Sequence, residues 1–239
     1  MGRIGGWLQF KGKYSYEFGC KIESLPSECA PKRRYQTAEV NGRSGVLHID
    51  TGTYEPVTLT ATLNLAGFAN VREIMDWLTG NGELVLSDCP DYCRRSFVID
   101  GNPFKRRGLS NGERWDSFTV KFQCDPFLYE SDPESFLLDT NPKTLVNPGT
   151  VPAEPLLVIS GTGRVVVTVG GVSVTLDGLV AESPITIDCD AKCAYKGAIA
   201  NQVSMTLNDH AWPTLPIGDT TIGWAGNASV KITPHWRWL

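Results

Sequence analysis

Cysteines in two closely spaced pairs are the first candidates for chemistry in this sequence. Cys89 and Cys93 form one pair and Cys189 and Cys193 the other, among seven cysteines in the chain. Zinc favours four tetrahedral ligands, and thiolates are among those that it binds. The two pairs fall in segments that are predicted below to form separate domains, so unrelated strand and loop cysteines are the favoured interpretation. We therefore expect no metal and mostly free thiols, several of them packed as small apolar side chains.

Catalytic side chains are the second set of candidates. A nucleophile with a histidine base would have to use one of three histidines, which are His48, His210 and His235. None of them lies near a nucleophile motif such as the strand-turn-helix elbow of hydrolases. Glycoside cleavage needs two facing carboxylates. The close aspartate pairs, Asp88 with Asp91 and Asp188 with Asp190, are typical of turns. The sequence thus predicts no catalytic residue, no cofactor-binding residue and no enzyme.

Binding of nucleotides or nucleic acids requires other patterns. Gly161-Thr-Gly163 follows a predicted strand, like the start of a dinucleotide fingerprint, but the third glycine is absent and Val165 continues as a strand where a helix must begin. A hairpin turn containing both glycines is expected instead. Three basic clusters could contact phosphates, namely Lys32-Arg33-Arg34, Arg94-Arg95 and Lys105-Arg106-Arg107. Because the formal net charge is −4, solvated loops or salt bridges are favoured for them.

Tryptophans near the C-terminus could form a sugar platform, because indole rings stack on the faces of pyranoses. They are Trp212, Trp224, Trp236 and Trp238. Sandwich cores and interfaces also use tryptophan, since its large ring gives much burial energy. Core and interface positions are the favoured interpretation. A carbohydrate-binding module that recognises cell-surface glycans stays open as the alternative function.

The composition fits a folded chain with protein partners. Hydrophobic residues make up 41% of the chain and charged residues 20%, which is enough apolar material for packed cores. No stretch approaches the roughly 20 apolar residues of a membrane-spanning helix, and the N-terminus lacks a hydrophobic signal core. We expect synthesis in a cytoplasm-like compartment, no membrane partner and no specific nucleic acid.

Alternating apolar and polar residues predict strands along most of the chain. From Val57 to Leu65 every second residue is apolar and the others are Thr or Asn, which is the pattern of a strand with one buried face. The same pattern recurs at 118–124, 172–176, 185–189, 203–207 and 230–232. Turn dipeptides are expected to separate the strands: Asn41-Gly42, Asn81-Gly82, Asn111-Gly112, Gly170-Gly171 and Asp177-Gly178.

A single segment, from about Asn70 to Thr79, is typical of a helix. Asn70 can cap its start and Gly80 can close its end. Its apolar residues at helical spacing are Val71, Ile74, Met75 and Leu78. One helix among many strands, with no β-α alternation, predicts an all-β fold of two antiparallel β-sandwich domains, the N-terminal one containing the helix.

Proline and glycine interrupt every regular pattern between about residues 131 and 155. This composition predicts a connector between domains. The chain is accordingly divided into an N-terminal domain at 1–135, a Pro-rich linker at 136–152 and a C-terminal domain at 153–239.

Several short segments occur in the order and spacing of a known family. In the first domain they are Phe10-Lys-Gly12-Lys-Tyr-Ser15, Val40-Asn-Gly42-Arg43-Ser-Gly45, Asp76-Trp77-Leu78, Leu86-Ser-Asp88-Cys-Pro90-Asp91-Tyr92 and Phe122-Gln-Cys124-Asp-Pro126-Phe127-Leu-Tyr129. In the second they are Asn147-Pro-Gly149-Thr, Ile159-Ser-Gly161-Thr-Gly163, Ile185-Thr-Ile187-Asp188 and Trp236-Arg237. Together they resemble the siphovirus distal tail protein family, the hub of the tail tip in phages of Gram-positive hosts.

The resemblance implies a ring, usually of six copies, made by the N-terminal sandwich, and a galectin-like or jelly-roll-like C-terminal sandwich. Such rings join the tail tube to the tail-associated hub or lysin protein at the tip of the virion, and DNA only passes through the channel. The implied product is made in the cytoplasm of the bacterial host, from a phage or a prophage. The self-contacts are expected in the N-terminal domain, and the sequence does not assign them to residues.

Overall fold

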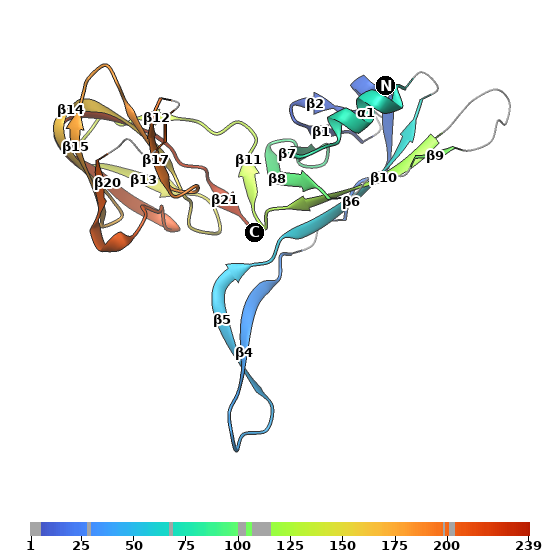
Figure 1. The fold of residues 1–239 in the computed structure, drawn as a ribbon, viewed down its shortest axis with the longest axis horizontal. Coiled ribbons are helices and arrows are strands. Elements are labelled where there is room, and N and C mark those ends of the chain that lie inside the picture. Colours follow the sequence, from blue (N-terminus) through green and yellow to red (C-terminus); the bar gives the residue numbers. More distant parts are fainter. Residues whose placement is uncertain are drawn as a thin grey trace. The chain divides into compact units, whose positions relative to one another are not determined.

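The computed structural model describes residues 6–27, 30–66, 69–99, 104–106, 116–197, 199–200 and 204–239. The contacts of the chain divide it into two compact units, one ending at Ser131 and the other running from Asp132 to Trp238. Each unit has its own hydrophobic core. Both are built of antiparallel strands, which confirms the all-β prediction with two domains (Figure 1). No helix among the described residues has the length and apolar character needed to cross a membrane.

The first unit contains one large sheet and one separate hairpin. The strands of the large sheet lie in the order β2-β1-β7-β8-β10-β6-β3, and β4 pairs only with β5. The elements of this unit are β1 (Leu8–Phe10), β2 (Lys13–Tyr14), the 3-10 helix η1 (Ser15–Phe18), β3 (Cys20–Ser24), β4 (Arg33–Glu39), β5 (Val46–Tyr54), β6 (Val57–Leu65), α1 (Val71–Trp77), β7 (Asn81–Leu86), β8 (Tyr92–Val98), β9 (Lys105–Arg106), β10 (Asp116–Cys124) and β11 (Leu128–Glu130).

The core of the first unit follows the alternation in β6. Leu59 and Leu63 are buried, whereas the threonines between the apolar positions face outward. Leu63 lies opposite Phe118 of β10 and Leu59 opposite Phe122, so two strands send their large side chains into one core. This one-sided burial is what a period of two dictates.

Helix α1 packs on this core, and the sequence predicted both its place and its cap. The side chain of Asn70 accepts a hydrogen bond from the backbone N–H of Arg72 at 3.2 Å. The helix has seven residues, about two turns, and ends at Trp77. Its buried residues are Ile74 and Trp77. Gly80, with φ of +65°, follows where the chain turns into β7.

Two of the predicted turns are wrong. Asp177-Gly178 lies inside a strand, β15 (Val172–Leu179), at a shift of its register, where Gly178 has φ of +74°. Asn81-Gly82 begins strand β7 instead of separating two strands. A Cβ atom at Gly82 would lie 2.9 Å from the Phe10 ring and 2.6 Å from the Lys11 side chain. The glycine is therefore required by close packing and not by a turn.

The second unit is one curled sheet dominated by two long strands, β14 and β20. It closes over a core that contains Leu157, Val167 and Ile232. The elements of this unit are β12 (Phe136–Leu137), β13 (Lys143–Asn147), β14 (Leu156–Val169), β15 (Val172–Leu179), β16 (Ile185–Asp188), β17 (Cys193–Lys196), β18 (Ile199–Ala200), β19 (Met205–Leu207), the 3-10 helix η2 (Asn208–His210), β20 (Gly218–Thr233) and β21 (Arg237–Trp238).

Strands β14 and β20 run through both halves of this curled sheet and pair with different strands in each half. Their register shifts between Thr162 and Val166. Before the shift β14 pairs with β16, and after it with β15. Strand β20 correspondingly pairs with β13 along its first part and with β12 along its last. The predicted hairpin at Gly170-Gly171 joins β14 to β15, as expected.

The glycines at 161 and 163 were expected in a hairpin turn, and that prediction is wrong. Both lie inside β14, at the bend that follows from the register shift. Gly163 has φ of +74°. A Cβ atom at Gly161 would lie 2.3 Å from the carbonyl oxygen of Asn227 on β20. The sequence pattern showed only that glycine was needed, and a strand bend meets that need as well as a turn does.

The linker predicted at 136–152 is also wrong. Strands β12 and β13 lie in this segment and both pair with β20, so it belongs to the second unit. Between them Asn141 donates to the carbonyl of Trp224 at 2.6 Å and accepts from its N–H at 3.0 Å. Proline and glycine here mark tight turns between short edge strands, where a missing N–H costs little.

Candidate interaction surfaces

The cysteines show no sign of a shared site. Six of them are described, and four of these, Cys20, Cys93, Cys124 and Cys189, are buried. Burial raises the pKa of Cys20 and Cys189 to about 12 and that of Cys93 to about 11, the direction opposite to that of a reactive thiolate. Cys29 lies outside the described residues. Within the described part of the chain, no group of three or more His, Cys, Asp or Glu side chains is placed to hold a metal ion.

The two close pairs of aspartates lie in turns, as the sequence indicated. The side chain of Asp188 accepts hydrogen bonds from the backbone N–H groups of Asp190 and Ala191, at 3.0 and 2.9 Å. Asp88 and Asp91 are exposed in the turn between β7 and β8. A carboxylate that caps its own turn is a structural group. Of the histidines, His48 lies on β5, while His210 and His235 lie in the second unit.

The four tryptophans are held against the core of the second unit. Trp236 is 8% exposed and belongs to that core, and Trp212, Trp224 and Trp238 pack partly buried against it. A stacking platform for sugars needs an exposed ring face. The arrangement favours the core interpretation of these residues.

The basic clusters lie largely in strands and not in loops, although Lys32, Arg33 and Arg34 are solvent-exposed as expected. Arg94 is 4% exposed in β8, and Arg95 lies over the Tyr129 ring at 4.2 Å. Arg33 is in β4, where its guanidinium bonds Asp50 at 2.7 Å, the salt bridge that was the other expectation. Lys105 and Arg106 form β9, and the Asn111-Gly112 turn and Arg107 lie outside the described residues. The sequence did not predict these strands, because a run of two or three charged residues shows no alternation of apolar and polar positions.

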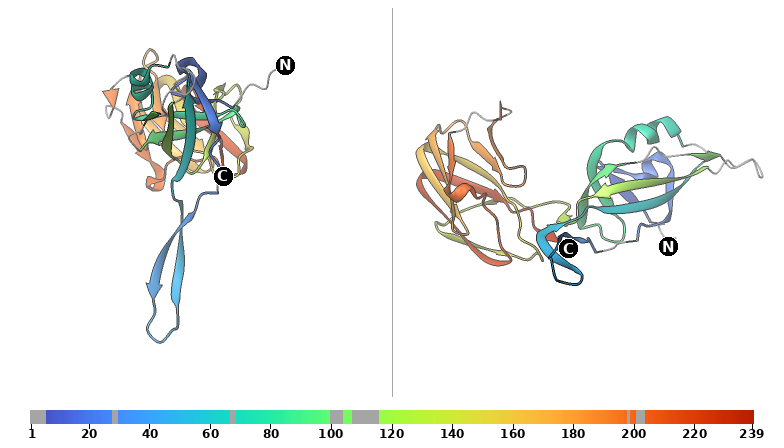
Figure 2. Two further views of the ribbon diagram at one scale, coloured as in Figure 1. Left: turned by 90° about the vertical axis from the view of Figure 1, so that its right-hand side faces the viewer. Right: turned by 60° about the horizontal axis from the view of Figure 1, so that its bottom comes forward.

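The most distinctive surface is the two-stranded ribbon of β4 and β5. It stands away from the rest of its unit (Figures 1 and 2). All its residues from Arg33 to Tyr54 are exposed except Ala38 and Tyr54, which are half-buried. An isolated two-stranded hairpin is marginally stable in water. The predicted Asn41-Gly42 turn lies at its tip.

Contacts at the base of the ribbon hold it on its unit. The Tyr54 ring meets the Phe127 ring edge-on, with centroids 5.7 Å apart. The Arg33 guanidinium lies 5.4 Å from the centre of the Tyr54 ring, and it also forms the ion pair with Asp50. These contacts fix where the ribbon leaves the unit.

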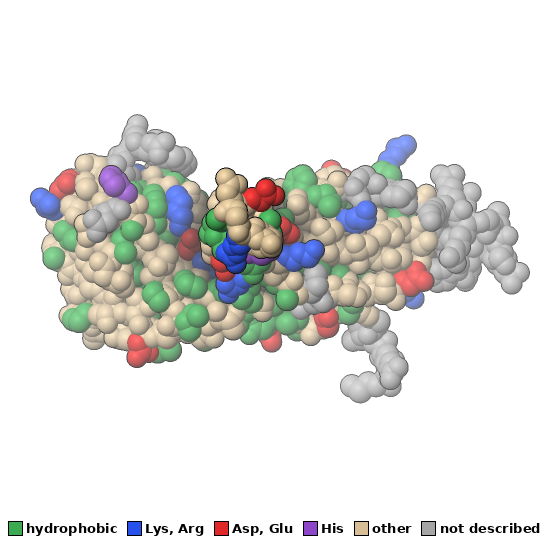
Figure 3. Space-filling model, turned by 90° about the horizontal axis from the view of Figure 1, so that it is seen from below, with side chains coloured by type: hydrophobic (Ala, Val, Ile, Leu, Met, Phe, Trp, Pro, Cys, Tyr) green, Lys and Arg blue, Asp and Glu red, His purple; other side chains and the backbone are tan. Residues whose placement is uncertain are grey.

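Both faces of the ribbon carry exposed apolar residues. The cross-strand pairs Gln36 with Ile49 and Ala38 with Leu47 share one face. The pairs on the other face are Tyr35 with Asp50, Thr37 with His48, and Glu39 with Val46. The first face carries Leu47 and Ile49 and the second carries Tyr35 and Val46, so exposed apolar side chains lie on both faces. Ile49 is 46% exposed and Leu47 is 37% exposed. Figure 3 views the ribbon end-on, with hydrophobic and charged side chains at its surface.

A second surface with exposed apolar residues is the outer face of the large sheet. Phe97 is 47% exposed there and Ile99 is 41% exposed. Phe97 sits in a row with the residues opposite it on neighbouring strands, which are Asn81, Gln123 and Thr58. Ile99 lies two residues further on and its N–H donates to the carbonyl of Lys121, so the same face continues past Phe97.

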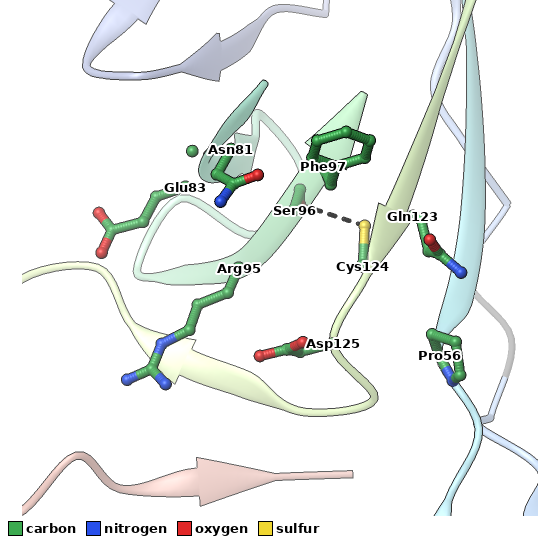
Figure 4. Close-up of a pocket in the computed structure, with 10 residues that line it drawn as sticks. Pro56, Asn81, Glu83, Arg95, Ser96, Phe97, Gln123, Cys124 and Asp125 are labelled. Carbon is green, nitrogen blue, oxygen red and sulfur yellow. Dashed lines mark hydrogen bonds between the residues drawn. The ribbon is translucent and has the colours of Figure 1, made fainter. Parts of the chain in front are cut away.

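This face is hollowed into an open groove of about 670 Å³ (Figure 4). Its floor includes Ser96 and Cys124, whose Oγ and Sγ atoms lie 3.2 Å apart. Beyond Phe97 the next row is charged, with Glu83 opposite Arg95. Pro56, two residues after the end of the ribbon, also lines the groove. We call this surface, from Glu83 and Arg95 to Phe97 and Gln123, the sheet groove.

Sequence reasoning missed both surfaces. The alternation in Leu47-His-Ile49-Asp50 is typical of a strand, and it was the local signal for the ribbon. For Phe97 and Ile99 the sequence held no usable signal, because only the packing decides which sheet face stays uncovered.

Comparison of the sequence with protein-family profiles and with curated protein sequences finds no match. Comparison of the structure with solved structures finds a match. The Dit protein of phage SPP1, described as a paradigm of the hub adsorption apparatus in phages that infect Gram-positive hosts, aligns with a TM-score of 0.70. The alignment covers 98% of this chain and 99% of that chain, with 9% sequence identity. The two chains share one fold.

Proposed function

We propose that this chain is a structural subunit of a siphovirus tail tip, where copies of it form a ring that joins the tail tube to the tail-associated hub protein. The observation that carries the proposal is the likeness to the SPP1 hub protein along almost the full length of both chains. A common sandwich could match one unit by chance. A match of both units in one alignment is a much stronger constraint, which the order of the resembling segments supports independently.

The bare ribbon and the sheet groove support assembly through the first unit. Exposed apolar sheet faces of this kind are hazards in a free protein and are normally covered by a partner. Two different surfaces on one chain can make head-to-tail contacts between copies. Such contacts form a closed ring when the rotation from one copy to the next divides a full turn evenly. Six copies is the number that the family resemblance implies.

The remaining features fit a scaffold role. Partners of the ring would be the tail tube protein and the hub or lysin protein, and its place would be the tail tip of the virion. The second unit, proposed to be galectin-like, would face other proteins. A glycan-binding role gains no support from tryptophans that pack against the core.

The experiment that tests this proposal measures the mass of the full chain in solution, alone and with tail-tube protein of the same phage. Native mass spectrometry and sedimentation velocity are expected to show a closed oligomer of identical subunits. A fragment that ends after Ser131 should keep the self-association, while residues 132–239 should be monomeric. Each contact should bury about 1,200–2,000 Å² in total, the range of stable interfaces.

The proposal fails if the full chain is monomeric at high concentration and also does not bind the tail-tube protein. Binding of a glycan array by the residue 132–239 fragment, together with those two negative results, would establish the carbohydrate-binding alternative.

A further inference from the structure

We propose that Asn41, at the tip of the ribbon, is a site of spontaneous covalent modification, where the side-chain amide is lost and the residue becomes aspartate or isoaspartate. The inference goes beyond the proposed function and does not depend on it, because the reaction needs only this chain and water. It rests on two Asn-Gly dipeptides of the first unit, at 41–42 and 81–82, that the fold holds in opposite ways. A third dipeptide, Asn111-Gly112, lies outside the described residues.

The reaction starts when the backbone nitrogen of Gly42 attacks Cγ, the side-chain carbonyl carbon of Asn41. A bond forms between these two atoms, the Cγ–Nδ2 bond breaks, and the amide group leaves as ammonia with the proton of the Gly42 nitrogen. Water then opens the five-membered ring on one side of its nitrogen. Opening at the side-chain carbonyl gives aspartate, and opening at the main-chain carbonyl gives isoaspartate. Glycine as the following residue favours the attack, since it has no side chain and its backbone is the most permissive.

Asn41 and Gly42 form the turn between β4 and β5, where the backbone can reach the geometry of this attack. Both residues are exposed, and neither belongs to a strand. A hydrogen bond spans the turn, from the N–H of Arg43 to the carbonyl of Val40 at 3.1 Å. A Cβ atom at Gly42 would have no neighbour within 4 Å among the described residues. Rotation of the Asn41 backbone therefore disturbs this turn and leaves the core of the unit intact.

The turn also lies far from the contacts that anchor the ribbon. The ring contact of Tyr54 with Phe127 and the ion pair of Arg33 with Asp50 are both at the base. Figures 1 and 2 show the opposite end of the ribbon standing clear of its unit. A two-stranded hairpin is marginally stable by itself, and exposed loop tips open at almost no cost in free energy. The tip of the ribbon is accordingly the part of the first unit where Asn-Gly is least restrained.

The second dipeptide is exposed at its asparagine in the same way, but its backbone is part of strand β7. Asn81 is paired with Phe97, and Gly82 with Ser96, in the ladder to β8. A Cβ atom at Gly82 would lie 2.9 Å from the Phe10 ring, so the backbone there is also closely packed. Attack on Asn81 would require this end of β7 to leave its sheet. The two sites thus share their dipeptide and the exposure of their asparagine, and they differ in backbone freedom.

The product changes the chemistry of the tip. A carboxylate stands where the amide stood, so each conversion makes the formal net charge of −4 more negative by one unit. Isoaspartate also carries the main chain through the side-chain carbonyl, which adds one methylene to the turn. A preparation of this chain therefore becomes a mixture of ribbon tips that differ in charge and in backbone length.

The test incubates the full chain in buffer at neutral pH and follows its peptides by mass spectrometry. Trypsin releases residues 35–43, which contain Asn41, and residues 73–94, which contain Asn81, as separate peptides. In the folded chain we expect peptide 35–43 to convert at least about tenfold faster, because a loop tip opens more readily than a paired strand. Fragmentation that distinguishes the two isomers should find both aspartate and isoaspartate at position 41.

Two controls separate the effect of the fold from that of the sequence. Asn41→Gln keeps an amide at the tip, but its ring would need six members, so peptide 35–43 of this variant should stay unmodified. Incubation of the wild type in guanidinium chloride removes the fold. The two peptides should then convert at similar rates, because both contain Asn-Gly in a flexible chain.

The inference is wrong if peptide 35–43 of the folded chain converts no faster than peptide 73–94. It is also wrong if aspartate forms without isoaspartate, since direct hydrolysis of the amide would then be the reaction. A rate difference that persists unchanged in guanidinium chloride would place its cause in the local sequence and overturn the argument from the fold. None of these results bears on the mass of the chain in solution, so the proposed function is tested separately.

Discussion

The indole N–H of Trp77 donates a hydrogen bond to the backbone carbonyl of Phe10 at 2.8 Å, inside the core of the first unit. The Trp77 ring also stacks on Phe18, with centroids 4.5 Å apart. One side chain thus ties the end of helix α1 to strand β1 and to the 3-10 helix η1. Helix α1 lies far from the other two elements in the sequence, and the bond connects it to them where α1 packs on the sheet.

Replacing Trp77 with phenylalanine should destabilise the first unit by about 1–3 kcal/mol. The substitution keeps most of the stacking on Phe18 but leaves the buried carbonyl of Phe10 without its donor, which has that cost. Urea unfolding followed by circular dichroism measures the change. Met75→Leu, at an exposed position of the same helix, should have almost no effect. An unchanged midpoint for Trp77→Phe would show that the bond contributes nothing net.

Asn147→Ala should destabilise the second unit by about 2–4 kcal/mol, because it leaves several buried groups without partners. The Asn147 side chain donates to the carbonyls of Val151 and Leu215 at 3.1 and 2.9 Å and accepts from the N–H of Gly149 at 2.8 Å. The matched control is Asn227→Ala, since that exposed side chain donates to Thr162 at 3.1 Å. Thermal unfolding of the two variants should therefore differ clearly, and equal melting temperatures would contradict the assigned role.

Gly161→Ala should be far more disruptive than Gly223→Ala, although both glycines lie in long strands. The added Cβ atom would lie 2.3 Å from the Asn227 carbonyl oxygen at position 161 but 3.4 Å from its nearest neighbour, an oxygen of Asn141, at position 223. Overpacking of this kind costs about 1–3 kcal/mol or more. Chemical denaturation of both variants tests the comparison. Equal stabilities would mean that the strand bend can relax.

Stability should fall as the pH rises above about 9, in part because of buried thiols. The pKa of Cys20 and of Cys189 is raised to about 12 in the folded chain, so the thiol stays protonated there after the unfolded chain has lost its proton. The stabilisation is complete below the unfolded pKa and is lost as the pH approaches the folded one. Each such thiol contributes up to about 1.4 kcal/mol per pH unit in that range.

The measurement compares the wild type with Cys20→Ala between pH 7 and 11. The difference in unfolding free energy should be constant up to about pH 8.5 and then shrink as the pH rises. A difference that stays constant to pH 11 would show that the Cys20 thiol ionises as readily in the folded chain as in the unfolded one.

The sequence by itself determined the class of the fold and its strongest elements. The alternation from Val57 to Leu65 dictates a strand with one buried face, whatever surrounds it. The helix from Val71 to Trp77 was equally readable, because a cap at Asn70 and apolar residues at helical spacing are local signals. The order of short segments indicated a resemblance, and the structure comparison finds the same fold in the Dit protein of phage SPP1.

Tertiary structure alone decided the features that depend on contacts between segments far apart in the sequence. Glycine at 161 fits a turn or a strand bend equally well, and only the approach of the Asn227 carbonyl selects the bend. The segment that looked like a linker became two edge strands because β20 offered them a partner. Phe97 and Leu47 are apolar residues like those of any core, and their exposure depends on how many layers cover each sheet. A local sequence pattern reports the period of a strand, and it is the packing of distant elements that sets which faces remain uncovered.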